Sequence, residues 1–183
     1  IEQKQFSVKH VSFGGGNFVH FVRTEPMLNQ AGLNQLAQNI KGLPQSVLTL
    51  DTFSWIQDEQ GRLNQLMATR KLCDQLELPL ALIVHESAHL HLGKNHGDII
   101  VISADAMSDQ GVLKMAGQVH KPVVLTRAPD ASIEQWMASA NMIQSQGNRQ
   151  LVLCDAGSYM DNQKQLKSID ITASSLMIKN TGL

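Results

Sequence analysis

The sequence predicts an α/β fold built on a parallel sheet, with residues 1–183 forming one domain. Short runs rich in β-branched apolar residues alternate with longer amphipathic stretches, and this alternation is typical of consecutive strand–helix–strand units. The runs are apolar at almost every position, as strands are when both faces of their sheet are covered. In chain order they are Val8–Phe13, Ser46–Leu50, Leu80–Val84, Ile99–Ser103, Pro122–Leu125 and Gln150–Cys154.

The clearest unit joins the last two of these strands. Ser132 can cap its helix, Trp136 and Ile143 fall on the apolar face, and Gly147 ends it. Units of this kind suit either a doubly wound sheet or an incomplete (β/α)8 TIM-type barrel, and periodicity is compatible with both. The predicted helices are Gln30–Ile40, Gly61–Gln75, Asp109–Gln118, Ser132–Gln146 and Ile169–Lys179.

The composition is that of a globular protein, with 43% hydrophobic and 17% charged residues. The formal net charge of -1 provides no basic field for nucleic acid. No apolar run approaches the roughly 20 residues that span a bilayer, so no membrane partner is expected. The amino terminus shows no signal sequence, so we expect a cytoplasmic protein in which Cys73 and Cys154 stay reduced and buried.

Several stretches of the second half carry a family resemblance. They read DIIVISADAM (98–107), KPVVLTRAPDASIEQW (121–136), QGNRQLVLCDAG (146–157) and SIDITASSLMIKNTGL (168–183). This text resembles DAHP synthase of the type that shares its barrel with 3-deoxy-D-manno-octulosonate 8-phosphate synthase. In the first half, FGGGN (13–17) resembles the first-strand motif of the octulosonate enzyme, and LPLALIVHES (78–87) is similar to the third strand.

The resemblance implies a (β/α)8 TIM-type barrel, with about six βα units present in this chain. It also implies an aldol-like condensation of phosphoenolpyruvate with a phosphorylated aldose, with substrates bound at the carboxyl ends of the strands. The expected partner is therefore a small phosphorylated molecule, and we expect a homo-oligomer. The chain ends where the family continues into a seventh strand; that strand and the next carry a His, a Glu and an Asp.

The resemblance implies catalytic roles for Asn17, His85 and Glu86. Asn17 stands where metal-independent octulosonate synthases have Asn and metal-dependent enzymes have Cys, which implies that no metal cofactor is needed. His85 and Glu86 match a His-Glu pair at the end of the third strand in the octulosonate branch.

Substrate-binding roles are implied for Thr126, Arg127 and Asp155. Arg127 matches a basic residue just after the fifth strand, and Asp155 matches an acidic residue after the sixth. Thr126 occupies the position of the family's phosphoenolpyruvate-binding Lys. The position therefore matches the family's binding site, but the residue type departs from the family pattern.

Other departures accumulate around the expected phosphate site. The family's phosphate-binding Arg is Ala156, its second-strand Lys falls within Thr49–Asp51, its fourth-strand Gln is Val101, and its third-strand Asp is Ile83. Hydrogen bonds to charged groups contribute about 1.5–3 kcal/mol each, so losing two cations should cost several kcal/mol of binding. We therefore expect impaired or lost catalysis, with a non-catalytic ligand- or protein-binding barrel as the alternative.

A competing prediction comes from the segment HESAH at 85–89, which spells the HExxH signature of zinc peptidases. On a helix, His85 and His89 would share one face and bind zinc, with Glu86 as general base and His96 as a further ligand. The preceding Leu80–Val84 predicts a strand, however, and Gly93 and His96 each fall one position late for the extended pattern. Histidines at a barrel mouth are the alternative.

Overall fold

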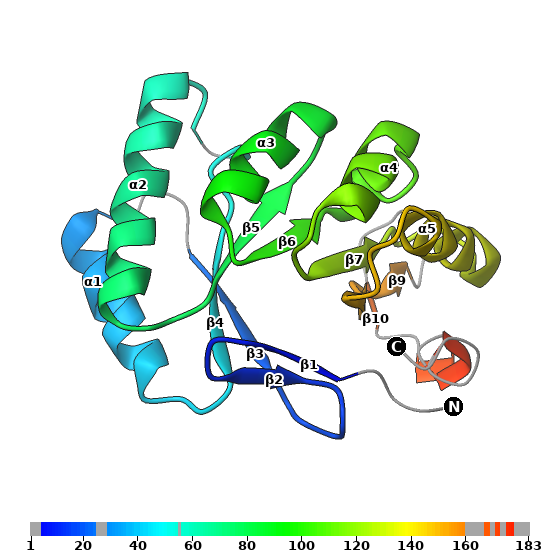
Figure 1. The fold of residues 1–183 in the computed structure, drawn as a ribbon, viewed down its shortest axis with the longest axis horizontal. Helices are drawn as coiled ribbons and strands as arrows, with labels where there is room; N and C mark the ends of the chain where they lie inside the picture. Colours follow the sequence, from blue (N-terminus) through cyan, green and yellow to red (C-terminus); the bar gives the residue numbers. More distant parts are fainter. Residues whose placement is uncertain are drawn as a thin grey trace.

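The structure, a computed structural model, describes residues 5–24, 29–54, 56–159, 167–168, 171–172 and 175–177. At its centre is a six-stranded parallel sheet whose strands lie side by side in chain order (Figure 1). The strands are β3 (His20–Arg23), β4 (Ser46–Leu50), β5 (Leu80–Val84), β6 (Ile99–Ile102), β7 (Val123–Arg127) and β8 (Leu151–Asp155).

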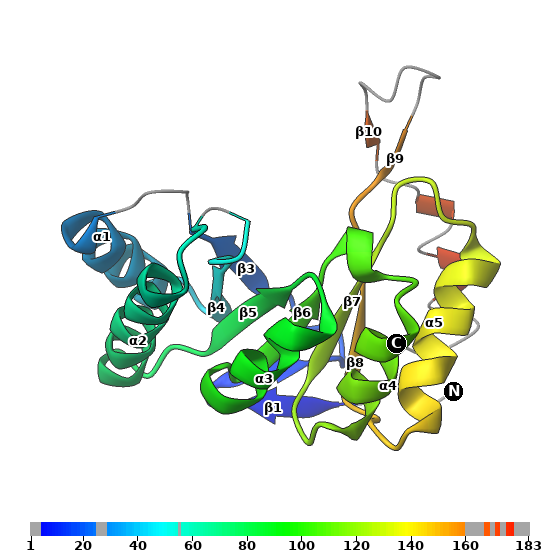
Figure 2. The ribbon, with the colours of Figure 1, turned by 90° about the horizontal axis from the view of Figure 1, so that it is seen from above.

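One α-helix connects each pair of successive strands, and the helices line the outer face of the curled sheet (Figures 1 and 2). Several begin at a side chain that accepts hydrogen bonds from first-turn backbone N–H groups, as Ser132 does for Gln135. A 3₁₀ turn, η1 (Ala104–Ala106), follows β6. The helices are α1 (Gln30–Lys41), α2 (Glu59–Gln75), α3 (Ser87–His96), α4 (Gln110–Gln118) and α5 (Ile133–Ser145).

This arrangement confirms the partial (β/α)8 barrel. In a doubly wound sheet the strand order reverses at a switch point and helices cover both faces. Here the strand order is sequential from β3 to β8, and the helices lie on one side of a curled sheet. None of the helices in the described part of the chain has the length and apolar character that a membrane span requires.

The predicted strand Val8–Phe13 is corrected to an antiparallel hairpin outside the sheet. Its two arms, β1 (Phe6–Val8) and β2 (Val11–Phe13), are joined by a turn in which Lys9 has a positive φ of 51°. A continuous strand cannot include such a left-handed residue, and β-branched runs alone do not reveal it. The first barrel strand is instead β3, a short segment with little burial that the sequence pattern did not indicate.

The hairpin covers the amino-terminal end of the sheet, opposite the end where β8 leads into the β9 (Ser158–Tyr159) and β10 (Lys167–Ser168) ribbon (Figure 2). Val11 and Phe13 are buried and belong to one apolar cluster with the sheet interior, including Val47 and Ala81. Lys9 also donates through Nζ to the Leu78 carbonyl at 2.8 Å. The interior of the half-barrel is therefore closed at one end.

Helix α3 was missing from the sequence prediction. Its ten residues include three histidines, and only Leu90 and Gly93 are buried, so its apolar face is too narrow to stand out. The predicted helix Ile169–Lys179 lies largely outside the described residues.

We expect Phe13→Ala to lower the free energy of unfolding by about 3 kcal/mol, because truncating a buried aromatic ring leaves a cavity. Phe13 is 4% exposed and stacks on Phe6 with ring centroids 4.9 Å apart. Urea unfolding would measure the loss. Phe18→Ala is the matched control, because Phe18 is 85% exposed and should change stability little. Equal losses for the two variants would contradict the proposed packing of the hairpin.

Candidate functional site

Alternation along the strands sorts the side chains into two sets. Val47 and Ala81 face the interior of the half-barrel, whereas the intervening Leu48 and Leu80 pack against the helices. Following this alternation to the carboxyl ends places Arg23, Asp51, His85, Thr126 and Cys154 on the interior side. We call this the carboxyl-end face, and it is where a (β/α)8 barrel carries its functional groups.

Asp51 is the centre of this face. Its side chain is fully buried, and its Oδ2 accepts from Arg23 Nη2 at 2.5 Å and from the Ser54 hydroxyl at 2.7 Å. Its Oδ1 accepts from the Ser54 backbone N–H at 3.1 Å and lies 3.2 Å from His85 Nε2. A buried carboxylate needs such compensation, because an unpaired one would be strongly destabilising.

His85 bridges two carboxylates. Its Nε2 lies near Asp51, and its Nδ1 is 3.1 Å from Oδ2 of Asp105 in η1. Desolvation acts to raise the pKa of Asp105, but interactions with Ser103 and His85 outweigh it and hold that pKa below the usual value. Both ring nitrogens of His85 therefore lie within hydrogen-bonding distance of a carboxylate oxygen.

His89 supports His85 from helix α3. Its Nδ1 accepts from the His85 backbone N–H at 3.3 Å, and its Nε2 lies 3.2 Å from Oε1 of Glu86. The ring stacks on Phe53 with a centroid separation of 3.5 Å. Desolvation by this packing is the main reason that the pKa of His89 is lowered, and the Glu86 carboxylate opposes the shift only in part. His89 is therefore suited to accept a hydrogen bond at Nδ1.

Of the predicted catalytic residues, His85 lies on the carboxyl-end face but Asn17 does not. Asn17 precedes β3 by three positions, at the amino-terminal end of the sheet, where its side chain donates to the Gly14 carbonyl at 2.8 Å. The FGGGN segment begins at the last residue of β2 and thus comes before the first barrel strand rather than at its carboxyl end. The inference that no metal is needed rested on Asn17 and loses that support.

Glu86 is separated from the interior as well. It is the residue that precedes α3, its side chain is 62% exposed, and its carboxylate approaches His89 rather than Asp51.

Arg127 and Asp155, the two charged residues predicted to bind substrate, face the helix layer rather than the interior. They are register partners on β7 and β8, with Arg127 Nη1 4.0 Å from Asp155 Oδ2. Arg127 donates through Nε and Nη2 to the Ala131 carbonyl, and its guanidinium lies over the Trp136 ring. Arg127 is only 5% exposed, so this cation holds the β7–α5 connection and is turned away from the interior.

Thr126 and Cys154 face the interior on the last two strands. They are register partners, and a hydrogen bond with the Thr126 side chain acts to lower the pKa of the Cys154 thiol. Cys154 is exposed rather than buried as predicted, because β8 is the edge strand of the six-stranded sheet. Desolvation and the neighbouring Asp155 carboxylate raise the pKa of this thiol, which favours the protonated, weakly nucleophilic form.

The zinc-peptidase geometry does not form. His85 and Glu86 precede α3, so the HExxH residues do not share one helix. His96 ends α3, seven residues after His89, which is about 10 Å along a helix at 1.5 Å per residue. Among the described residues, no three His, Cys, Asp or Glu side chains are grouped to hold a metal ion.

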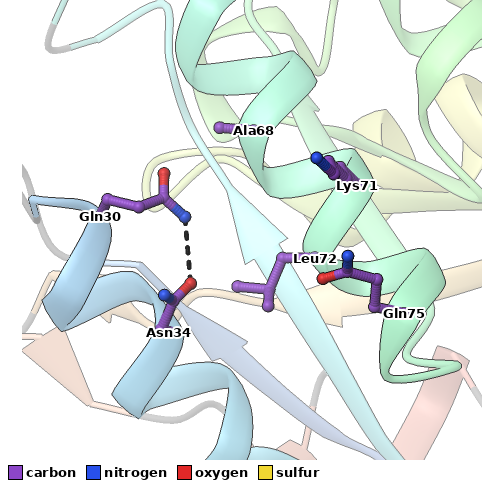
Figure 3. A pocket seen from close by; sticks show the side chains of 6 residues that line it. All are labelled: Gln30, Asn34, Ala68, Lys71, Leu72 and Gln75. Carbon is purple, nitrogen blue, oxygen red and sulfur yellow. Dashed lines mark hydrogen bonds between the residues drawn. The ribbon is translucent and has the colours of Figure 1, made fainter.

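Three members of the network were not among the residues predicted from the family. Asp51 follows β4 directly and Asp105 lies in η1 just beyond β6, and these positions were a usable signal for them. Arg23 was missed because β3 was not predicted. A separate pocket between α1 and α2 is lined by Gln30, Asn34, Ala68, Lys71, Leu72 and Gln75 (Figure 3). It lies in the helix layer and contains none of the predicted site residues.

Sequential parallel strands with outer helices, and polar side chains gathered where the strands end, define a partial (β/α)8 barrel. The sequence model of the DAHP synthetase I family matches residues 39–183, and the chain belongs to this family.

One curated relative is the phospho-2-dehydro-3-deoxyheptonate aldolase of Thermotoga maritima. It is 32% identical over 88 residues, which cover 48% of this chain and 26% of the relative. The crystal structure of a T. maritima protein of the same name matches with a TM-score of 0.88 at 24% identity, covering all of this chain and 54% of that one.

A truncated form of the 3-deoxy-D-arabino-heptulosonate 7-phosphate synthase of T. maritima matches with a TM-score of 0.85, also at 24% identity. That match covers all of this chain and 67% of the other. The likeness to both solved structures shows the fold, and the chain spans about half the length of the first of them, 54%.

We expect Asp51→Asn to lower the free energy of unfolding by about 2–3 kcal/mol, because it removes the charge opposite Arg23 and turns an amide donor toward the donors of Ser54. Urea unfolding would measure this change. Asp105→Asn is the control, because the Asp105 side chain is 68% exposed and should cost at most about 1 kcal/mol. A neutral Asp51→Asn variant would contradict a central role for this carboxylate.

The lowered pKa of His89 predicts that the protein is less stable in acid. The unfolded chain binds a proton at His89 near pH 6.5, whereas the folded chain binds it only at lower pH. Stability from this group is therefore present above about pH 6.5 and lost as the pH falls toward the folded-state pKa.

Urea unfolding at pH 7.5 and 5.5 should show a smaller loss of stability on acidification for His89→Gln than for the unchanged protein. His120→Gln is a control histidine outside this network. Identical pH dependence of stability in His89→Gln and the unchanged protein would show that His89 does not cause the loss of stability in acid.

Proposed function

We propose that this barrel retains the fold of the phosphoenolpyruvate-condensing synthases but binds a small molecule without catalysing their reaction. The observation that carries the proposal is the orientation of Arg127. It is the basic residue that the resemblance supplies for phosphate, and it packs against Trp136 and the Ala131 carbonyl in the helix layer.

The charges that do face the interior support the same proposal. Arg23 is bound to Asp51, and Asp105 adds a second carboxylate beside His85. Thr126 and Ala156 stand where the family has Lys and Arg. A phosphate dianion at this face would meet carboxylates in place of the charge-assisted Lys and Arg pairs that hold phosphates best.

A small molecule remains the proposed kind of partner, since the carboxyl-end face is the ligand-binding end of this scaffold. A homo-oligomer and a cytoplasmic location complete the proposal. β3 and β8 have unpaired outer edges among the described residues, and a paired or covered edge is the more stable state.

Direct binding of phosphoenolpyruvate tests the proposal without requiring a complete barrel. The unchanged chain and the double variant Thr126→Lys/Ala156→Arg would be titrated by calorimetry. We expect no saturable binding by the chain and at least about tenfold tighter binding by the double variant, because each restored cation contributes about 1.5–3 kcal/mol. The double variant Gln35→Lys/Asn141→Arg, at exposed positions of the outer helices α1 and α5, controls for the two added positive charges.

Turnover supplies the second measurement. Phosphate release from phosphoenolpyruvate with erythrose 4-phosphate or arabinose 5-phosphate should be absent, both for this chain and for any longer protein that contains it. The Thermotoga maritima aldolase is the positive control. Robust phosphate release from the longer protein would refute the loss of catalysis. Tight phosphoenolpyruvate binding by the unchanged chain would refute the argument that the missing cations prevent phosphate binding.

A further inference from the structure

A cavity of about 330 Å³ lies between the first two helices of the outer layer, α1 and α2 (Figure 3). Its volume is within the range of about 300–1,000 Å³ that is typical of pockets for small molecules. Figure 3 shows Leu72 projecting from α2 toward Asn34 on α1, and Ala68 lies one turn before Leu72 on the same helix. Ala68 and Leu72 therefore give the cavity an apolar floor between polar side chains from both helices.

The α1 side of the cavity is polar but uncharged. Gln30 Nε2 donates to Asn34 Oδ1 at 3.0 Å, and this hydrogen bond holds the two amides together. Helix α1 contains no acidic residue along its whole length. Among the described residues, the lining of the cavity includes no carboxylate, so an anion placed there meets no like charge from the walls.

The α2 side supplies one cation, Lys71. Its side chain is exposed and has no ion pair or hydrogen bond with any residue that the structure describes. The acidic neighbour three positions along, Asp74, is already bound: its Oδ1 accepts from Arg70 Nη2 at 2.6 Å and lies 3.7 Å from Lys9 Nζ. Gln75 lies one turn after Lys71, so the two residues present an ammonium group and an amide donor to the same cavity.

The cavity beside the hairpin turn has a different electrostatic character. It is lined by Lys9, His10, Asp74 and Glu77, and therefore includes two carboxylates. Its cation, Lys9, already donates to the Leu78 carbonyl at 2.8 Å. Of these two cavities, the one between α1 and α2 is thus the one whose lining favours an anion.

We propose that the cavity between α1 and α2 binds a small organic carboxylate with an apolar body. The carboxylate pairs with the Lys71 ammonium group and accepts a hydrogen bond from the Gln75 amide, since a charge-assisted hydrogen bond is stronger than one between neutral groups. The apolar body covers Ala68 and Leu72 and removes their surface from water. The site lies in the helix layer, apart from the carboxyl-end face, so it does not depend on whether the barrel has lost its synthase activity.

Titration of three compounds into ¹⁵N-labelled protein tests the proposal, with NMR at the backbone amides of Asn34, Ala68 and Lys71 as the readout. Isocaproate supplies both the charge and the apolar body, isocaproamide lacks the charge, and acetate lacks the apolar body. We expect saturable shifts with isocaproate, about fivefold weaker binding of isocaproamide and at least about tenfold weaker binding of acetate. The amides of His85 and Asp105, at the carboxyl-end face, should not shift.

Lys71→Gln isolates the contribution of the charge. It should weaken isocaproate binding about fivefold and leave isocaproamide binding unchanged, because only the charged compound pairs with the ammonium group. Lys41→Gln is the matched control, because Lys41 is an exposed lysine in the last turn of α1 that does not line the cavity. This control should change the binding of neither compound.

Ala68→Phe tests the cavity itself. The larger side chain fills the space beside Leu72 and should abolish the binding of both isocaproate and isocaproamide. Met67→Phe is its control, because Met67 is 56% exposed on the same helix and does not line the cavity. Thermal unfolding of each variant establishes that it is folded before binding is measured.

Equal affinity for isocaproate and isocaproamide, or unchanged isocaproate binding in Lys71→Gln or Ala68→Phe, would overturn the proposal. So would the absence of saturable shifts with isocaproate, or shifts confined to the carboxyl-end face. Turnover of phosphoenolpyruvate by a longer protein would instead refute the proposed function and leave this site standing, so the two failures are distinguishable.

Discussion

The in-and-out alternation of side chains along six parallel strands is the constraint on which the rest of this structure depends. Because neighbouring strands pair in a fixed register, a shift of one position moves a side chain from the interior to the helix layer. Thr126 and Arg127 are adjacent in the chain, yet one faces the interior and the other packs on Trp136. A shift of one position along β7 therefore decides whether a cation would face the interior, where it could bind phosphate, or would pack in the helix layer.

The same constraint explains how Asp51 can be both buried and charged. It stands one step beyond Leu50 on the interior side, where Arg23, Ser54 and His85 converge from separate elements. Each partner satisfies part of a carboxylate that could not otherwise be buried. His89 stabilises this arrangement from helix α3, because its ring stacks on Phe53 and accepts a hydrogen bond from the His85 backbone N–H. The network thus couples the ends of β3, β4 and β5 to helix α3.

The features that the chain shares with its family belong to the scaffold, whereas the residues that depart from the family pattern are side chains of the interior. The apolar strands, the caps of the helices and the hairpin under the sheet preserve the scaffold, since these depend on burial and backbone hydrogen bonds. The interior polar residues are under no such requirement, so Thr126 can depart from the pattern that the resemblance implies without disturbing the fold. This separation is consistent with a barrel that is retained while its ligand changes.

The sequence by itself determined the βα rhythm, five of the six sheet strands and four of the five crossover helices, because buried strands and amphipathic helices have periods that short windows reveal. It also placed His85 and Asp51 at strand ends. Only the tertiary structure separated the β1–β2 hairpin from the sheet, put Asn17 at the opposite end, and turned Arg127 and Asp155 toward the helices. These outcomes depend on which strand pairs with which and on the face that each side chain takes, and contacts between distant residues decide both.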